Sequence, residues 1–184
     1  MTKTKKDIKT ELEIPEGIDV AVNHSIIKVK GKAGEVSRSL FNPMIKTIKD
    51  GNKVVVKSLR SSKRELKIVN SFIAHIKNMF RSASEGSRYV LKICSGHFPM
   101  NVSMKGNEFI VKNFFGEKIP RVMQIKSGAN VKIEGDLVTV ESADKELTSQ
   151  IAADIEKLTR RTTYDMRVFQ DGIWIIEKDG KKVK

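Results

Sequence analysis

The chain has 184 residues, which suits one domain or two small ones. Lys and Arg outnumber Asp and Glu by 35 to 22. The resulting charge of +13 indicates a polyanionic partner, because cations gain affinity by releasing counterions from phosphates. Cys94 is the single cysteine, so an intrachain disulfide is excluded, which fits a reducing cytoplasm. No apolar run approaches the ~20 residues of a membrane span, and we therefore expect no membrane partner.

The first half of the chain begins with short strands. Apolar residues alternate from Ile18 to Val29, with a tight turn at Asn23-His24-Ser25, and such alternation predicts strands with one buried face. The residues 31–34 supply a second turn. Further strands are expected at 35–40, 45–48 and 54–56, and Asp50-Gly51-Asn52 joins the last two as a hairpin because Asp-Gly tolerates positive φ.

A helix follows these strands. From Leu66 to Phe80 the apolar residues recur at helical spacing and form one stripe. Ser61 or Ser62 can cap its start, with Glu65 in the first turn. Residues 82–87 are rich in Ser and Gly, which predicts a short linker after the helix.

The same order of elements then returns. Adding 82 carries Val20, Val29 and Gly34 onto Val102, Val111 and Gly116, and adding 84 carries Gly51, Val54 and Val56 onto Gly135, Val138 and Val140. A second amphipathic helix presents Leu147, Ile151, Ile155 and Leu158. The alternative is that small hairpins resemble one another by chance, but the number of matches favours a duplication.

These patterns predict an α+β fold of two tandem duplicated modules, each a small antiparallel β-sheet covered on one face by an α-helix. We expect the first module at 1–86, with a basic N-terminal tail. The second is expected at 87–184, with a C-terminal extension that contacts RNA.

The chain offers little that could perform catalysis. His24, His75 and His97 are dispersed, and the pair Cys94 and His97 lacks the further ligands that a zinc site requires. Phosphate-binding loops and nucleophile elbows are missing from the sequence. We therefore expect no enzyme activity, cofactor, metal or small-molecule substrate, and an apolar environment for Cys94 in a strand at 89–94.

Basic and aromatic residues gather in two segments of the second half. Arg160 and Arg161 end the second helix, where cations favour its negative dipole end. Residues 162–174 mix aromatics, Arg and Gly with neither helical nor strand period, which suits an ordered extension against RNA. Phe114-Phe115 could stack bases, the alternative being one core and one turn residue.

Three motifs carry a resemblance to a known family. Ile14-Pro-Glu-Gly-Ile18, Asn113-Phe-Phe-Gly-Glu-Lys-Ile-Pro-Arg121 and the segment from Arg161 to Ile173 resemble ribosomal protein L-six of the large subunit, in its archaeal and eukaryotic-cytosolic branch. The likeness covers roughly residues 10 to 176. The bacterial branch has a Lys- and Gly-rich last motif where this chain has Phe169-Gln-Asp-Gly172, so bacterial contacts are not carried over.

The resemblance implies a structural constituent of the cytoplasmic ribosome. It implies binding to large-subunit rRNA near the sarcin–ricin loop and the translation-factor site, with neighbouring large-subunit ribosomal proteins as further partners. It names the second domain as the main rRNA reader. The RNA-binding residues that it implies are Lys118, Arg121, Arg160, Arg161 and Arg167, with Tyr164 and Phe169 as packing partners.

The distribution of charge points the other way. Residues 1–86 hold 18 Lys and Arg against 9 acids, and residues 87–184 hold 17 against 13. Charge alone therefore favours the first half as the RNA binder, whereas the resemblance favours the second. The competing hypothesis for function is a free-standing basic chaperone of RNA or DNA, which would bind any duplex with similar affinity.

Overall fold

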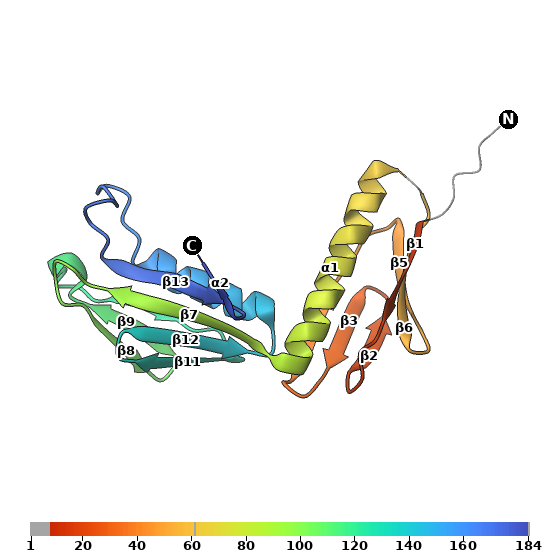
Figure 1. Cartoon of the computed structure of the whole chain (residues 1–184), viewed down its shortest axis with the longest axis horizontal. Coiled ribbons are helices and arrows are strands. Elements are labelled where there is room, and N and C mark those ends of the chain that lie inside the picture. Colours follow the sequence, from red (N-terminus) through yellow and green to blue (C-terminus); the bar gives the residue numbers. More distant parts are fainter. Residues whose placement is uncertain (1–7, 61, 184) are drawn as a thin grey trace. The chain divides into compact units, whose positions relative to one another are not determined.

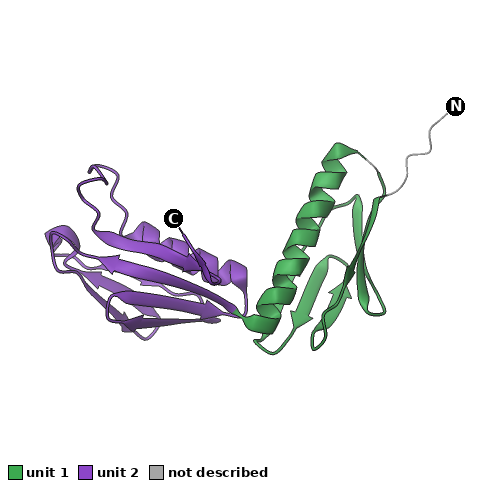
Figure 2. Cartoon of the chain, in the orientation of Figure 1, with its two compact units in different colours: residues 1–86 green, residues 87–184 purple. Residues whose placement is uncertain are grey.

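The computed structural model describes residues 8–60 and 62–183. The basic tail expected at the N-terminus, and Ser61 as a helix cap, lie outside the described residues. The chain divides into two compact units, residues 1–86 and 87–184 (Figure 2). Each unit is α+β, and each has a helix packed against its strands (Figure 1).

Unit 1 contains two three-stranded antiparallel sheets and one helix. The sheets have the orders β1-β6-β5 and β2-β3-β4. The elements are β1 (Ile8–Glu13), β2 (Asp19–Asn23), β3 (Ile26–Lys30), β4 (Glu35–Ser39), β5 (Ile45–Asp50), β6 (Lys53–Ser58) and α1 (Lys63–Glu85). β1 was not predicted, because Leu12 is its one buried side chain and charged residues surround it.

α1 has the predicted start and buried stripe but a later end. Ser62 caps it by accepting from the N–H of Arg64. The linker predicted at 82–87 is wrong, because the helix continues to Glu85 and Gly86 follows it with φ 78. Ser82 and Ala83 are buried in this last turn, and the Ser82 hydroxyl donates to the carbonyl of Asn78 at 2.9 Å.

Unit 2 repeats this arrangement and extends it. Its sheets have the orders β10-β9-β8 and β11-β12-β7-β13-β14. The elements are β7 (Ser87–Cys94), β8 (Asn101–Lys105), β9 (Glu108–Lys112), η1 (Phe114–Gly116), β10 (Arg121–Gln124), β11 (Ala129–Glu134), β12 (Leu137–Ser142), α2 (Lys145–Leu158), β13 (Gly172–Lys178) and β14 (Lys181–Lys182). Its core centres on Leu91, Phe109, Phe114, Ile151 and Ile155.

The ladder registers confirm the duplication. The partners Val20 and Val29 recur as Val102 and Val111, shifted by 82. In the other sheet, Ile45 and Ser58 recur as Ala129 and Ser142, shifted by 84. The strand order β1-β6-β5 corresponds to β7-β12-β11. One duplicated domain therefore accounts for both units.

Two segments of unit 2 have no counterpart of equal length in unit 1. Val29 pairs with Val36, whereas the equivalent Val111 pairs with Arg121, so the predicted match of Gly34 with Gly116 is wrong. Residues 31–34 join β3 to β4, but the longer insertion 113–120 joins β9 to β10. The second addition is everything after α2, which contains β13, paired with β7, and the short strand β14.

The C-terminal extension is only partly irregular. Residues from Gly172 onward form β13, with Ile173 fully buried and paired with Ile93. The expectation of an extension without strand structure up to residue 174 is therefore wrong beyond Asp171. A short apolar run such as Ile173-Trp-Ile-Ile176 has no period that separates strand from helix.

Candidate nucleic-acid interface

The loop of residues 160–171 is held at both ends by one side chain. Thr159 follows the last helical residue of α2, and its hydroxyl accepts from the N–H of Ile173 at 2.9 Å. The same hydroxyl donates to the carbonyl of Glu156. Because α2 and β13 are both fixed in the core of unit 2, the loop begins and ends on rigid elements.

An aromatic cluster fills the space between this loop and the insertion after β9. Phe115, from η1, stacks on Tyr164 with ring centroids 5.7 Å apart and planes inclined by 19°. Phe169 contacts both rings, at 6.1 Å from Phe115 and 5.0 Å from Tyr164. Tyr164 keeps 40% of its surface exposed. The two segments that unit 1 lacks therefore pack together in unit 2.

Arg161 lies on this cluster. Its guanidinium is 4.6 Å from the centroid of Tyr164 and 5.4 Å from that of Phe115. A guanidinium over aromatic faces is attracted by the ring quadrupole and loses less freedom on binding than a mobile side chain. The arrangement presents an oriented cation beside an exposed ring, which matches the chemistry of a phosphate and an unpaired base.

Arg121 has its donors engaged inside the chain. Its Nε and Nη2 donate to both oxygens of Glu117 at 2.8 and 2.7 Å, and its Nη1 donates to the carbonyl of Leu158 at 2.7 Å. The guanidinium also lies 4.3 Å from the centroid of Phe114. Hydrogen bonding from Arg121 holds the pKa of Glu117 below its usual range. Arg121 thus fastens the insertion to the end of α2.

In unit 1 the turn between β3 and β4 contacts the end of α1 without a charged side chain. There the N–H of Ala33 donates to the carbonyl of Ala83, near the end of α1, at 2.9 Å. Gly31 permits this approach, because a Cβ at residue 31 would lie 2.3 Å from the same carbonyl oxygen. Unit 2 replaces this close turn by the insertion and the Arg121 contact.

Asp171 anchors the far end of the loop. Its carboxylate is buried and accepts from the backbone N–H of His97 at 2.9 Å, while the His97 ring Nδ1 lies 2.5 Å from its other oxygen. The His97 ring packs on Phe169 at 4.8 Å. Burial raises the pKa of Asp171, but the hydrogen bonds from His97 and Gly96 outweigh burial and lower the pKa below its usual value.

The remaining predicted cations lie at the surface of unit 2. Lys118 and Arg160 are exposed. The Arg167 side chain is 89% exposed and pairs with Asp165 through Nε at 3.2 Å and Nη2 at 3.0 Å. This hydrogen bonding lowers the pKa of Asp165 and raises that of Arg167. Arg167 therefore carries its own counter-ion in the free protein.

The structure thus brings three of the predicted residues, Arg161, Tyr164 and Phe169, into direct contact. Sequence reasoning missed His97 and Asp171, which are 74 residues apart and show no shared pattern. For Phe114 and Phe115 the structure fits the alternative of one core and one turn residue, since Phe114 is buried and Phe115 lies in η1 and joins the surface cluster. Base stacking by this pair stays a prediction.

Neither a membrane span nor a metal cluster appears in the parts of the chain that the structure describes. Neither α1 nor α2 combines the length and the apolar character needed to cross a bilayer. Cys94 and His97 do not belong to any group of three possible metal ligands within residues 8–60 and 62–183.

Comparison with known proteins identifies the family. The family model described as ribosomal protein L6 matches residues 14–86 and 98–172, one match in each unit. A protein named large ribosomal subunit protein uL6 from Haloarcula marismortui is 41% identical over 173 residues, 94% of this chain and 97% of that protein. One of the same name from Methanococcus vannielii is 43% identical over 174 residues, 95% and 96% of the two chains. The chain belongs to the ribosomal protein L6 family.

Proposed function

We propose that the chain is a structural constituent of the large subunit of the cytoplasmic ribosome and performs no catalytic step. The names of its relatives place those proteins in the large subunit, and the charge of +13 suits an rRNA partner. The proposed binding region is large-subunit rRNA near the sarcin–ricin loop and the translation-factor site, with other ribosomal proteins as neighbours. The sequence motifs of the family resemblance support this location.

The observation that carries the proposal is the position of Arg161 over Tyr164 and Phe115. The rings come from the two segments that distinguish unit 2 from unit 1. Arg161 contacts phosphate in this proposal, and the exposed part of the Tyr164 ring stacks on an unpaired base. Exposed Arg160 and Lys118 add further phosphate contacts, and Arg167 exchanges Asp165 for phosphate.

Two of the predicted residues take positioning roles in this proposal. Arg121 holds the insertion against α2 and has three nitrogen donors already engaged. Phe169 lies between His97 and Tyr164 and supports the ring beneath Arg161. Both residues would then affect RNA binding by fixing the geometry of Arg161 and Tyr164.

The test compares full-length protein on two RNAs at one salt concentration. One RNA is an rRNA fragment spanning the sarcin–ricin region, and the other is an unrelated duplex of equal length. The proposal predicts a clear preference for the first RNA and a loss of that preference in Arg161→Ala. Arg88→Ala removes an exposed cation of unit 2 that pairs with Glu141 and serves as the matched control. Equal affinity for both RNAs would favour the free-standing chaperone.

A further inference from the structure

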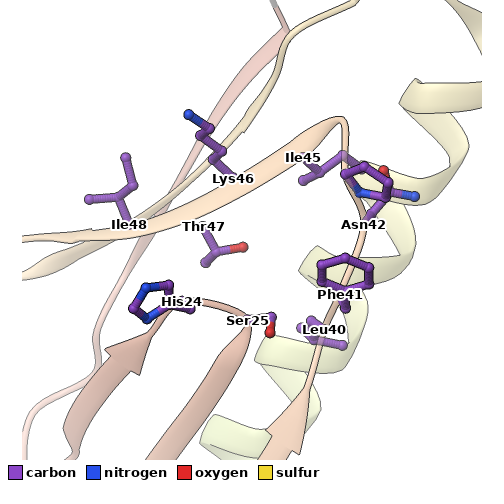
Figure 3. Close-up of a pocket in the computed structure, with 10 residues that line it drawn as sticks. His24, Ser25, Leu40, Phe41, Asn42, Ile45, Lys46, Thr47 and Ile48 are labelled. Carbon is purple, nitrogen blue, oxygen red and sulfur yellow. The ribbon is translucent and has the colours of Figure 1, made fainter.

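A groove in unit 1 lies between the edges of its two sheets. It is lined by the β2–β3 turn at His24 and Ser25, by residues 40–43 and by residues 45–48 of β5 (Figure 3). β2 and β5 are both edge strands. Lys49 bridges them by donating to the carbonyl of Val20 at 2.8 Å, and the groove borders the part of β5 that precedes this contact. An edge strand offers main-chain groups that another chain can pair with.

The groove has a buried apolar floor, and one of the hydroxyl groups that line it has no hydrogen-bond partner among the described residues. Leu40 and Ile45 are buried beneath it, whereas Phe41 is 75% exposed. Thr47 points its side chain into the space between His24 and Phe41 (Figure 3). Its hydroxyl oxygen is buried without a hydrogen-bond partner among the described residues. Such an orphan costs free energy unless another molecule satisfies it.

The equivalent place in unit 2 lacks these features. The bond from the N–H of Leu40 to the carbonyl of Ser25 recurs as the bond from Ile125 to Asn107. Beside it, the Asn107 side chain donates to the carbonyl of Ile125 at 3.2 Å. The positions of His24, Phe41 and Thr47 are taken in unit 2 by the residues Gly106, Lys126 and Val131. The duplicated fold therefore does not require the groove, which is a property of unit 1.

The lining indicates what would occupy the groove. Of its ten residues none is acidic, Lys46 is cationic, and five are apolar. We propose that the groove binds an extended segment of another large-subunit protein, which pairs along the edge of β5. That segment packs an apolar side chain on Phe41 and carries an acidic residue opposite Lys46. A single lining lysine suits a short acidic segment better than a polyphosphate backbone.

The first test uses assembled large subunits. The photoreactive residue p-benzoylphenylalanine is placed at position 41 of the full chain, subunits carrying it are irradiated, and the cross-linked product is identified by mass spectrometry. The proposal expects one protein segment that combines apolar and acidic residues. The same group at position 137, an exposed leucine of unit 2, should not yield that segment. A cross-link to rRNA, or none at all from position 41, would overturn the proposal.

The second test uses the cross-linked segment as a synthetic peptide and the full-length protein. Lys46→Glu should weaken peptide binding by ~10-fold or more, because it places like charges opposite one another. Lys67→Glu, on the exposed face of α1, makes the same charge change and should leave binding unaltered. Thr47→Val should also weaken binding without lowering the melting temperature, since it removes a hydroxyl that has no partner in the free protein. Unchanged affinity in both Lys46→Glu and Thr47→Val would contradict the proposed docking mode.

Discussion

His97 contacts the buried carboxylate of Asp171 with both its backbone N–H and its ring, across 74 residues of sequence. The contact joins the segment that follows β7 to the loop that precedes β13, and these two strands are paired. From His97 a continuous series of contacts runs through Phe169 and Tyr164 to Arg161. The buried carboxylate of Asp171 is thus connected, contact by contact, to the surface that we propose binds rRNA.

Replacing Asp171 by Asn should destabilise unit 2. The amide of Asn presents a donor where the carboxylate accepts from His97 and Gly96, so at least one buried polar group loses its partner. The expected cost is ~1–3 kcal/mol in the free energy of unfolding, measured by urea denaturation of the full chain. Asp165→Asn, which removes a more exposed carboxylate of the same loop, should cost less. Equal costs would show that burial of Asp171 contributes nothing.

The same carboxylate should contribute to acid sensitivity. Because folding lowers the pKa of Asp171, the folded state favours its ionised form. The stabilisation is complete above the unfolded pKa of about 4 and is lost as pH falls through the lower folded pKa. The difference in unfolding free energy between wild type and Asp171→Asn should therefore shrink as pH falls from about 6 toward 3. A difference that stays constant over this range would rule out ionisation of Asp171 as its source.

Arg161 should matter for its shape as well as for its charge. Arg161→Ala should weaken binding to the sarcin–ricin-region fragment by ~1–3 kcal/mol, as expected for loss of a charge-assisted hydrogen bond. Arg161→Lys should restore only a small part, because a compact ammonium cannot stack on the Tyr164 and Phe115 rings as a planar guanidinium can. The dissociation constants are measured by titration at one salt concentration. Full recovery of affinity in Arg161→Lys would show that Arg161 contributes only its positive charge.

Salt should weaken RNA binding steeply. Each phosphate that a Lys or Arg neutralises releases counterions, and several contacts would lower affinity by roughly 10³-fold between about 50 and 200 mM salt, taking the B-DNA relation as a guide. The slope of log affinity against log salt concentration is the measurement. Arg161→Ala should make the slope shallower, whereas Asp171→Asn, which removes no cation, should change affinity more than slope. A wild-type slope near zero would exclude phosphate contacts.

The sequence predicts the repeated strands well, because alternation and the Asp50-Gly51 turn are local signals. It fails at β1, where Leu12 is the one buried side chain. This segment forms a strand because it pairs with β6, which lies 40 or more residues away in the sequence. It also fails at the end of α1, where the burial of Ser82 and Ala83 outweighs the weak helix propensity of serine. The candidate site is likewise only partly predictable. Arg161, Tyr164 and Phe169 were found because they lie in one contiguous sequence motif. The supporting contacts of His97 and Glu117 depend on which distant segments the fold brings together.

The last prediction decides which unit reads the RNA. Unit 1 holds the larger surplus of positive charge, but unit 2 holds the oriented guanidinium, the aromatic cluster and the two added segments. Each unit buries an apolar core of its own, so the fragments 1–86 and 87–184 can be prepared separately and checked for folding by circular dichroism. Geometry rather than net charge should decide, because an oriented Arg gives up less freedom per contact than dispersed Lys.

We therefore expect residues 87–184 to retain most of the affinity of the full chain for the sarcin–ricin-region fragment, and residues 1–86 to bind weakly and without preference. Arg161→Ala and Arg167→Ala in the full chain should each reduce affinity, the second less strongly because Arg167 must first leave Asp165. If residues 1–86 bind as tightly as the full chain and both substitutions are silent, the charge surplus of unit 1 determines binding. The aromatic cluster of unit 2 would then be a structural feature of its loop alone.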